Sequence, residues 1–336
     1  MIDIKFKNIR QRDEYGKSIV QLIETLSSKA DMTRKSNLDK EALRKQYIDT
    51  LGYPLNCYEQ FKPLAINVKT ESLTEDETMT AVWYQLEVME NFWFSGILYE
   101  PKEKSPCKNA LVIAQHGGGG SAEIVGSLVL DSDNYNHMVK RVLRKGISVF
   151  APQLLLWSTD VYKSRGYNRN DLDHRLKQFG GSITALEIFC IKRSIDYFSD
   201  FFDENKIGML GLSYGGMYAL YTAAADTRIK STLSSCWFGE RLDHIWTDWV
   251  YFNQLNVFST EEAGSLVLPR KLYVEIGKED DYFSPEKAEL YLKNLEEYAK
   301  IFNCADSLKI SVFDGDHELD KAACGIEFFI KGLLCD

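Results

Sequence analysis

The 336-residue sequence lacks the short motifs that mark several classes of protein. Its seven cysteines are an odd number with no CxxC pair, which is typical of reduced thiols in a cytoplasmic protein and not of a disulfide scaffold. Its five histidines form no HxxxH or HxH group, so the sequence contains no local metal-binding motif. We therefore expect no metal and no other cofactor, although a metal site assembled from distant residues stays open.

The sequence also lacks a long run of basic residues, a long apolar run and the apolar core of a signal peptide. Its net charge is −9, whereas binding to nucleic-acid phosphates requires a basic surface. No apolar run reaches the length of a membrane span, and residues 1–17 contain no apolar core of a signal peptide. We expect a cytoplasmic protein that binds neither nucleic acid nor membrane. Nothing in the sequence indicates its oligomeric state.

What the sequence does contain is a change of pattern near residue 60. Residues 1–60 predict mostly helix, because apolar residues recur at three- and four-residue steps in 16–28 and 37–52. We expect this part to be a helical N-terminal extension that packs on the core and carries no chemistry. Residues 61–336 are interpreted as one enlarged α/β domain, although the length alone would also allow two ordinary domains.

Strand-like segments dominate the chain after the extension. Runs rich in β-branched and aromatic residues between 64 and 100 predict antiparallel strands. After them, short apolar strands alternate with helices, which is typical of a mostly parallel central sheet with helices on both faces. The parallel strands are expected at 110–115, 147–151, 206–211, 229–233, 271–276 and 308–313. The predicted fold class is therefore α/β, with the chemistry at the carboxyl ends of the strands.

Two long insertions, residues 154–181 and 237–269, interrupt this alternation at the end of the sheet where a site is expected. Both are rich in aromatic residues, which makes them candidate walls of a binding pocket. Trp157 and Trp237 are the residues in them that we expect to bind a substrate. Aromatic side chains in long loops more often cover the small core of the loop itself, so this alternative stays open for each of them.

The most informative stretch surrounds Ser213. An apolar strand ends at Gly211-Leu212-Ser213-Tyr214-Gly215, and an Ala- and Leu-rich helical pattern follows. A serine at the apex of such a sharp turn has a strained backbone that is tolerated only if the residues two before and two after carry no side chain. The pattern predicts a nucleophile elbow that presents the hydroxyl of Ser213 at a helix N-terminus. A plain glycine-rich turn is the alternative.

A serine hydroxyl needs a base to take its proton and an acid to hold that base. In the chain order that accompanies such an elbow, the acid and then the histidine follow the serine. Only His244 and His317 come after Ser213, and His244 lies inside an insertion, so His317 is the predicted base. The acid is expected after the strand that ends near residue 276. Asp280 is our choice, and Asp281 is the alternative.

Acyl transfer also needs two backbone amides that bind the oxyanion. The elbow supplies one of them, the N–H group of Tyr214. The other is expected from the glycine-rich loop after the strand 110–115, where the candidates are Gly117, Gly118 and Gly119. His116 is expected to order this loop and to lie at the substrate site. The loop matches neither a P-loop nor a dinucleotide-binding motif.

In this order, the segments HGGGG, GLSYGG, GKEDDYFSP and GDHEL resemble the α/β-hydrolase-fold serine hydrolases. More narrowly, they resemble the acetyl-xylan-esterase-like and dienelactone-hydrolase-like branch of that fold. The resemblance covers about residues 60–336, and the stretch 197–237 is its most specific part. It implies an α/β-hydrolase fold, a triad of Ser213, Asp280 and His317, and an oxyanion hole built from the amides named above.

The sequence departs from this pattern at two positions. Dienelactone hydrolases have a cysteine where this chain has Ser213, so lactone ring opening is not the expected reaction. Many relatives have an aspartate where this chain has Gln153, so their substrate preference does not transfer. The first hypothesis is a serine esterase that hydrolyses a small-molecule carboxylic ester through an acyl-enzyme intermediate. The alternatives are a peptidase of the same fold and a catalytically silent protein that binds a ligand or partner.

Overall fold

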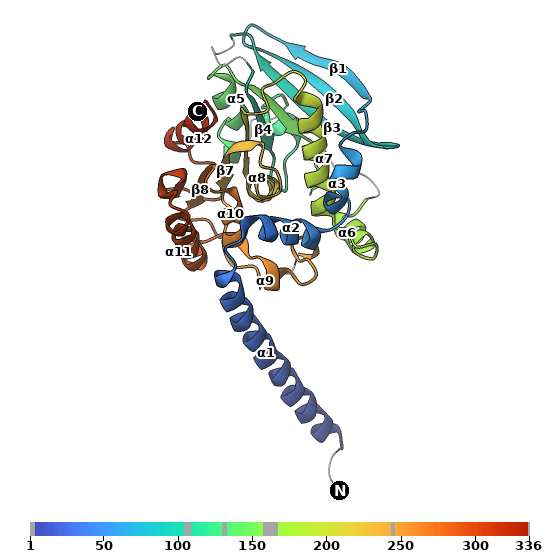
Figure 1. Ribbon diagram of the computed structural model, residues 1–336, viewed down its shortest axis with the longest axis vertical. Coiled ribbons are helices and arrows are strands. Elements are labelled where there is room, and N and C mark those ends of the chain that lie inside the picture. Colours follow the sequence, from blue (N-terminus) through green and yellow to red (C-terminus); the bar gives the residue numbers. More distant parts are fainter. Residues whose placement is uncertain (1–3, 104–108, 130–132, 157–166, 243–245, 335–336) are drawn as a thin grey trace.

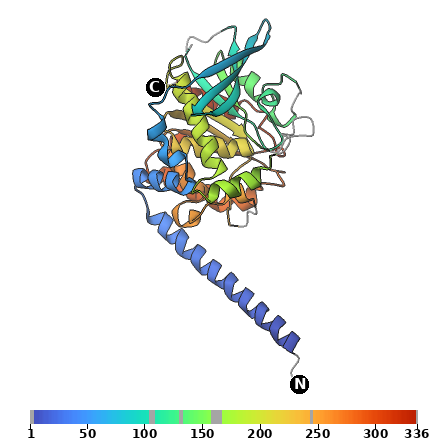
Figure 2. The same cartoon turned by 90° about the vertical axis from the view of Figure 1, so that its right-hand side faces the viewer.

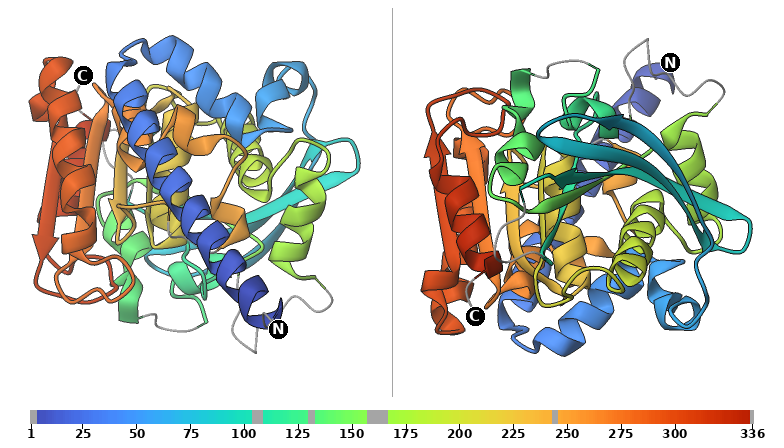
Figure 3. Two further views of the ribbon diagram at one scale, coloured as in Figure 1. Left: turned by 90° about the horizontal axis from the view of Figure 1, so that it is seen from below. Right: turned by 90° about the horizontal axis from the view of Figure 1, so that it is seen from above.

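The centre of the computed structural model is a nine-stranded sheet with the strand order β1-β2-β3-β5-β4-β6-β7-β8-β9 (Figure 1). The structure describes residues 4–103, 109–129, 133–156, 167–242 and 246–334. The strands are β1 Val68–Glu75, β2 Met79–Met89, β3 Phe92–Pro101, β4 Leu111–Gln115, β5 Ser148–Pro152, β6 Ile207–Leu212, β7 Ile229–Ser235, β8 Lys271–Gly277 and β9 Leu308–Phe313. In Figure 3 the C-terminal strands lie at one side of the body and β1–β3 at the other.

The direction of the strands agrees with the sequence pattern. Strands β1, β2 and β3 pair antiparallel, and β3 is also antiparallel to β5. All pairs from β5 through β4, β6, β7 and β8 to β9 are parallel. Every residue of β4, β5 and β6 is buried, as expected for strands covered on both faces. The prediction of a mostly parallel sheet that begins with antiparallel strands is confirmed.

Helices cover both faces of this sheet. The described helices are α1 Ile4–Ser36, α2 Lys40–Leu51, α3 Tyr58–Phe61, α4 Ala122–Val125, α5 Met138–Leu143, α6 Arg169–Lys177, α7 Ile183–Phe198, α8 Tyr214–Ala225, α9 Gln254–Val257, α10 Thr260–Val267, α11 Pro285–Ile301 and α12 Cys324–Leu334. Alternate residues of β6 enter different apolar cores: Met209 joins a core with α7, α8, α10 and α11, and Leu210 joins one with α5 and α12. This alternation is the period of a strand, and it produces a helix–sheet–helix sandwich.

The two aromatic insertions contain helices that the sequence did not predict. Helix α6 lies in the first insertion, and α9 and α10 lie in the second. Helix α10 is fully buried, and a capping box between Ser259 and Glu262 closes its N-terminus. These helices have only four to nine residues, and α6 has two apolar residues among nine, so they are too short or too polar to show the apolar periodicity of a helix.

The helical extension is only partly packed on the core. Helix α2 begins after Asp39, whose side chain accepts hydrogen bonds from two backbone N–H groups, and it ends at Gly52 with a φ angle of 94°. Its residues Leu43, Tyr47 and Leu51 are buried in the body. Helix α1, in contrast, projects from the body over most of its length (Figures 1 and 2). The expectation of an extension packed on the core therefore describes α2 and not most of α1. No helix in the described part of the chain is long and apolar enough to span a membrane.

Candidate active site

Ser213 occupies a strained turn between β6 and α8. Its φ and ψ angles are 61° and −122°, a conformation that non-glycine residues rarely adopt. A Cβ atom added to Gly211 would lie 2.3 Å from the carbonyl oxygen of Gly215, and one added to Gly215 would lie 2.1 Å from that of Gln115. Both distances are far below van der Waals contact. The turn therefore requires glycine two residues before and two residues after the serine, which is the physical reason for the G-x-S-x-G motif.

His317 forms a hydrogen bond with Asp280. The imidazole Nδ1 lies 2.8 Å from Oδ2 of the carboxylate, and because a carboxylate only accepts, Nδ1 carries the proton. The other carboxylate oxygen accepts the backbone N–H groups of Tyr282 at 2.8 Å and Phe283 at 2.9 Å. Asp280 is 2% exposed, whereas Asp281 is exposed. Of the two carboxylates that the sequence offered, only Asp280 lies against the imidazole in the structure.

The surroundings of Asp280 keep its carboxylate ionised. Burial alone would raise the pKa of Asp280, but the hydrogen bond and the charge of His317, together with the backbone N–H groups of Phe283 and Tyr282, hold it below its usual value. The rings of Phe283 and Tyr282 also pack on the imidazole, with centroid distances of 5.9 and 5.1 Å. The same short turn after β8 therefore fixes both the charge of the acid and the orientation of the histidine.

The end of β7 connects the serine to the histidine loop. The backbone N–H of Ser213 donates to the carbonyl of Ser235, the last residue of β7, at 2.9 Å. The thiol of Cys236, the next residue, donates to the carbonyl of Glu318 at 3.2 Å. Because Glu318 follows His317 directly, the serine turn and the histidine loop meet at the carboxyl end of β7. This is the edge of the sheet at which the sequence placed the site.

One group of side chains in the described part of the chain has the composition of a metal site. The ligand atoms of Cys236, Asp280 and His317 lie within 4.8 Å of one another. Burial, and then the nearby Asp280 carboxylate, raise the pKa of the Cys236 thiol well above its usual value, so the thiol stays protonated and is a poor metal ligand. The imidazole Nδ1 and the carboxylate already bind each other. These contacts fit a histidine–carboxylate pair better than a metal site.

The glycine loop after β4 lies against the elbow. A Cβ atom on Gly117 would be 3.3 Å from the Cβ atom of Ser213. The N–H group of Gly117 donates to the hydroxyl of Tyr135 at 2.6 Å, so this amide already has a partner. Within the residues that the structure describes, no partner is found for the N–H groups of Gly118 and Gly119. Of the three predicted loop amides, that of Gly117 is therefore in use, and those of Gly118 and Gly119 stay candidates for the oxyanion hole.

His116 is held mainly by backbone groups, and the side-chain amide of Gln153 lies 3.5 Å from its Nε2. Its Nε2 accepts the N–H of Leu154 at 3.1 Å, and its Nδ1 donates to the carbonyl of Gly117 at 2.9 Å. Burial lowers the pKa of His116 to about 4, so the ring is neutral. With no exposed surface and both nitrogens in use, His116 orders the glycine loop and the start of the first insertion. It has no free polar atom for a substrate.

The two tryptophans predicted at the substrate site differ in what can be said of them. Trp157 lies outside the described residues. Trp237 has no exposed surface and packs edge-on against Tyr221 and Trp249, with centroid distances of 5.2 and 5.8 Å. The guanidinium of Arg241 lies 4.6 Å from the centre of its ring. Trp237 therefore packs in the interior among other aromatic rings and exposes no surface to a substrate.

A buried charge cluster, which the sequence analysis missed, joins the two insertions to the elbow helix. Arg169 of the first insertion binds Asp248 of the second at 2.7 Å, Glu187 of α7 at 2.9 Å, and the hydroxyl of Tyr218 in α8 at 2.8 Å. The hydroxyl of Tyr214, the residue after the serine, donates to the same Asp248 carboxylate at 3.0 Å. Burial alone would lower the pKa of Arg169, but the two carboxylates outweigh this effect and raise it. Arg169 therefore stays charged.

A sequence signal for this cluster did exist. Glu187 lies in the apolar stretch ITALEIFCI of α7, and a carboxylate inside a buried helix requires a cationic or hydrogen-bonding partner. That requirement points to a buried arginine or lysine elsewhere in the chain, but it does not identify which one. Only the folded structure pairs Glu187 with Arg169.

Comparison with known proteins supports the fold. The sequence matches no protein-family model and no curated protein. Solved structures with a similar fold include a glucuronoyl esterase from Solibacter usitatus (TM-score 0.64, 14% identity, 89% of this chain and 93% of that chain covered) and acetyl xylan esterase 1 from a Thermoanaerobacterium species (0.58, 12%, 88% and 94%). A methylesterase is also similar (0.67, 16%, 88% of this chain), but the chain spans only 63% of its length. At these identities the likeness establishes the fold, and it confirms the predicted α/β-hydrolase architecture.

Proposed function

We propose that this α/β-hydrolase-fold protein is a serine esterase that hydrolyses a small-molecule carboxylic ester through an acyl-enzyme intermediate. The observation that carries the proposal is the 2.8 Å hydrogen bond between His317 and the buried Asp280. This pair lies at the edge of the sheet where a strained turn presents Ser213. A nucleophile, a base and a group that orients the base are the parts that such a reaction needs.

In the proposed reaction, Ser213 Oγ attacks the ester carbonyl while His317 Nε2 takes the hydroxyl proton. The carboxylate of Asp280 accepts the Nδ1–H bond and stabilises the imidazolium that forms. The tetrahedral oxyanion accepts hydrogen bonds from the N–H of Tyr214 and from Gly118 or Gly119. The C–O bond of the ester then breaks, and the imidazolium protonates the departing alcohol. Water, deprotonated by the same histidine, attacks the acyl-enzyme and releases the acid together with Ser213.

The names of the structural neighbours support the choice of ester hydrolysis. The three proteins compared above are a glucuronoyl esterase, an acetyl xylan esterase and a methylesterase. Their likeness to this chain concerns the fold, so the acyl and alcohol groups of its substrate have to be found by assay. Esters of uronic acids, acetylated sugars and methyl esters are the first compounds to offer.

Covalent labelling and hydrolysis assays together test the proposal. The purified protein is offered a short-chain aryl ester, the matching amide and a peptide, and it is also treated with a fluorophosphonate probe. We expect hydrolysis of the ester and labelling at Ser213. Ser213→Ala should abolish labelling and lower kcat by about 10⁴-fold or more. Ser235→Ala is the matched control, because it removes a hydroxyl at the same edge of the sheet, and it should retain activity within about tenfold.

Each alternative function has its own outcome in this experiment. Labelling of Ser213 with cleavage of the peptide alone would identify a peptidase. A folded protein that neither reacts with the probe nor hydrolyses any of the three compounds would be catalytically silent, and the proposal would be wrong.

A further inference from the structure

Helix α1 exposes an apolar stripe that no other residue in the described part of the chain covers. All side chains from Phe6 to Leu26 are exposed, and the helix meets the body only near its C-terminus. There Arg34 forms a buried ion pair with Glu262 at 3.1 Å, and Ala30 is buried. Packing, and not intrinsic propensity, supplies most of the stability of a helix in a protein. The apolar residues in the projecting part of α1 therefore have no packing partner among the described residues.

The stripe has the seven-residue spacing of a coiled-coil seam. Ile9, Gly16, Ile23 and Ala30 recur every seven residues. Ile19 and Leu26 follow Gly16 and Ile23 by three, and Arg12 is the one charged residue at this position between Ile9 and Ala30. The four large side chains of this seam are 41–54% exposed. Gly16 breaks the series of large residues in the middle of the helix, where glycine costs helix stability. A Cβ atom there would meet nothing within 4 Å in the single chain, so the fold of one chain does not require this glycine.

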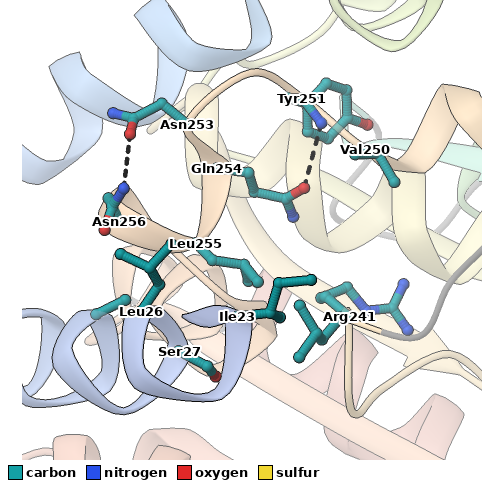
Figure 4. A pocket seen from close by; sticks show the side chains of 12 residues that line it. Ile23, Leu26, Ser27, Arg241, Val250, Tyr251, Asn253, Gln254, Leu255 and Asn256 are labelled. Carbon is teal, nitrogen blue, oxygen red and sulfur yellow. Dashed lines mark hydrogen bonds between the residues drawn. The ribbon is translucent and has the colours of Figure 1, made fainter. Parts of the chain in front are cut away.

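A groove continues the seam at the base of α1. Figure 4 shows Ile23, Leu26 and Ser27 on one side of it, and residues 250–256 with Arg241 around the rest. Its volume is about 300 Å³. Hydrogen bonds from Asn256 to Asn253 and from the Tyr251 N–H to Gln254 fix its far wall. Nε2 of Gln254 and Nη1 of Arg241 are buried, and among the described residues neither has a hydrogen-bond partner.

The charge of α1 is opposite to that of the rest of the chain. The helix carries eight Lys or Arg and four Asp or Glu, a net charge of +4. Since the whole chain carries −9, the remaining residues carry −13. A basic helix that projects from an acidic body is attracted to the acidic body of another copy.

We propose that α1 is the dimerisation element of this protein and that its partner is the α1 helix and the groove of a second copy. The two helices run antiparallel about a two-fold axis, so each contact occurs twice. Ile9 of one copy packs against Leu26 of the other, and Gly16 faces Ile19 of the other. The N-terminal half of each helix enters the groove of its partner, where Asn8 and Asp13, which flank the seam, bring acceptors for the two unpaired donors. The absence of a side chain at Gly16 gives the opposing Ile19 room to pack.

A lipid surface is the other partner that a basic helix with exposed apolar residues could have. The shape of the site favours a second copy. A bilayer is flat, and it cannot enter a groove closed on one side by α1 and on the other by residues 250–256. A helix from another chain has the width and the curvature to do so.

Sedimentation equilibrium of the full chain over about 1–100 μM tests the proposal. We expect a monomer–dimer equilibrium within this range. Ile19→Glu introduces two charges into the seam and should raise the dimer dissociation constant by about 100-fold or more. Gln21→Glu adds the same charge on the opposite face of α1, and it should change that constant less than about threefold.

Gly16→Leu separates close packing from helix propensity. Leucine raises the helix propensity at this position, so a variant with higher helix content and a weaker dimer identifies a close approach at Gly16. Since these side chains are exposed and far from Ser213, all three variants should keep the hydrolytic activity of the parent protein. A chain that stays monomeric throughout, a dimer that Ile19→Glu leaves intact, or a monomer that pellets with anionic phospholipid vesicles would each overturn the proposal.

Discussion

Asp280→Asn is the substitution that examines the proposed mechanism most directly. The asparagine keeps the side-chain oxygen that accepts the N–H groups of Tyr282 and Phe283 at 2.8 and 2.9 Å. The turn after β8 should therefore keep its shape. The other carboxylate oxygen, which lies 2.8 Å from His317 Nδ1, becomes an NH₂ group that donates. The imidazole must then present the lone pair of Nδ1 to this group, which places its proton on Nε2.

That change of tautomer removes the base. An Nε2 that carries a proton cannot accept one from Ser213, and the variant also lacks the negative charge that stabilises the imidazolium. The loss of kcat expected for replacing the acid of a Ser-His-Asp triad by its amide is about 10⁴-fold, or about 5.5 kcal/mol in the barrier. The free energy of unfolding should change much less at neutral pH, because the two N–H contacts remain.

The assay compares kcat and KM for an aryl acetate with urea unfolding of the same preparations. Asp281→Asn is the matched control: its side chain is exposed, so we expect a change in kcat of less than about threefold. The pKa of Asp280 is lowered in the folded protein, so its ionised form stabilises the parent above about pH 4, and this contribution is lost as the pH falls through the lower folded value. The variant should lack that loss. If Asp281→Asn were the more damaging change, our choice of acid would be wrong.

Two further predictions concern stability and rest on buried charges outside the reacting groups. Arg169→Met leaves two buried carboxylates without their cation, so the free energy of unfolding in urea should fall by about 3–5 kcal/mol. The control, Arg175→Met, removes an exposed ion pair and should lower that free energy by less than about 1 kcal/mol. Equal losses would contradict the importance of the cluster. Glu275 in β8 has its pKa raised to about 7, chiefly by burial, so between about pH 4.3 and 7 the folded state binds a proton that the unfolded state has released, and stability falls as the pH rises. Glu275→Gln should therefore stabilise the protein by about 1–3 kcal/mol more at pH 8 than at pH 5. The control, Glu279→Gln at an exposed position, should show no such difference. An increase in the free energy of unfolding that is the same at both pH values would refute this account.

The parts of the molecule that were predictable from sequence are those whose physics is local. The elbow is mostly one of them, because the clash that forbids a side chain at Gly211 is with Gly215 of the same motif, although the clash at Gly215 is with Gln115 of the neighbouring strand β4. The buried strands are another, because their apolar runs are continuous and bounded by turn residues. The place of Asp280 beside His317 was predictable to within one residue. The choice against Asp281 became clear only from the turn that buries one carboxylate and exposes the other.

Three of the predicted site residues have contacts with distant segments that the sequence did not indicate. His116 looked like a residue of the substrate site, but the N–H of Leu154 occupies its one free nitrogen. Gly117 looked equivalent to its neighbours, but the hydroxyl of Tyr135 takes its amide. Trp237 is buried because Arg241 and Trp249 cover it. In each case the partner lies on another element, and no periodicity within the segment could reveal it.

The buried charge cluster around Arg169 also connects the two insertions to the proposed site. Arg169 belongs to the first insertion and binds Asp248 of the second, so it joins the two insertions. It also binds Tyr218 on the helix that begins directly after Ser213. Because a buried charge without its partner is costly, neither insertion can move far while the other and the helix stay in place. The two insertions and the helix that begins after Ser213 are therefore held by one network, so we expect a change in either insertion to be tolerated only if it preserves the pairing of Arg169 with Asp248.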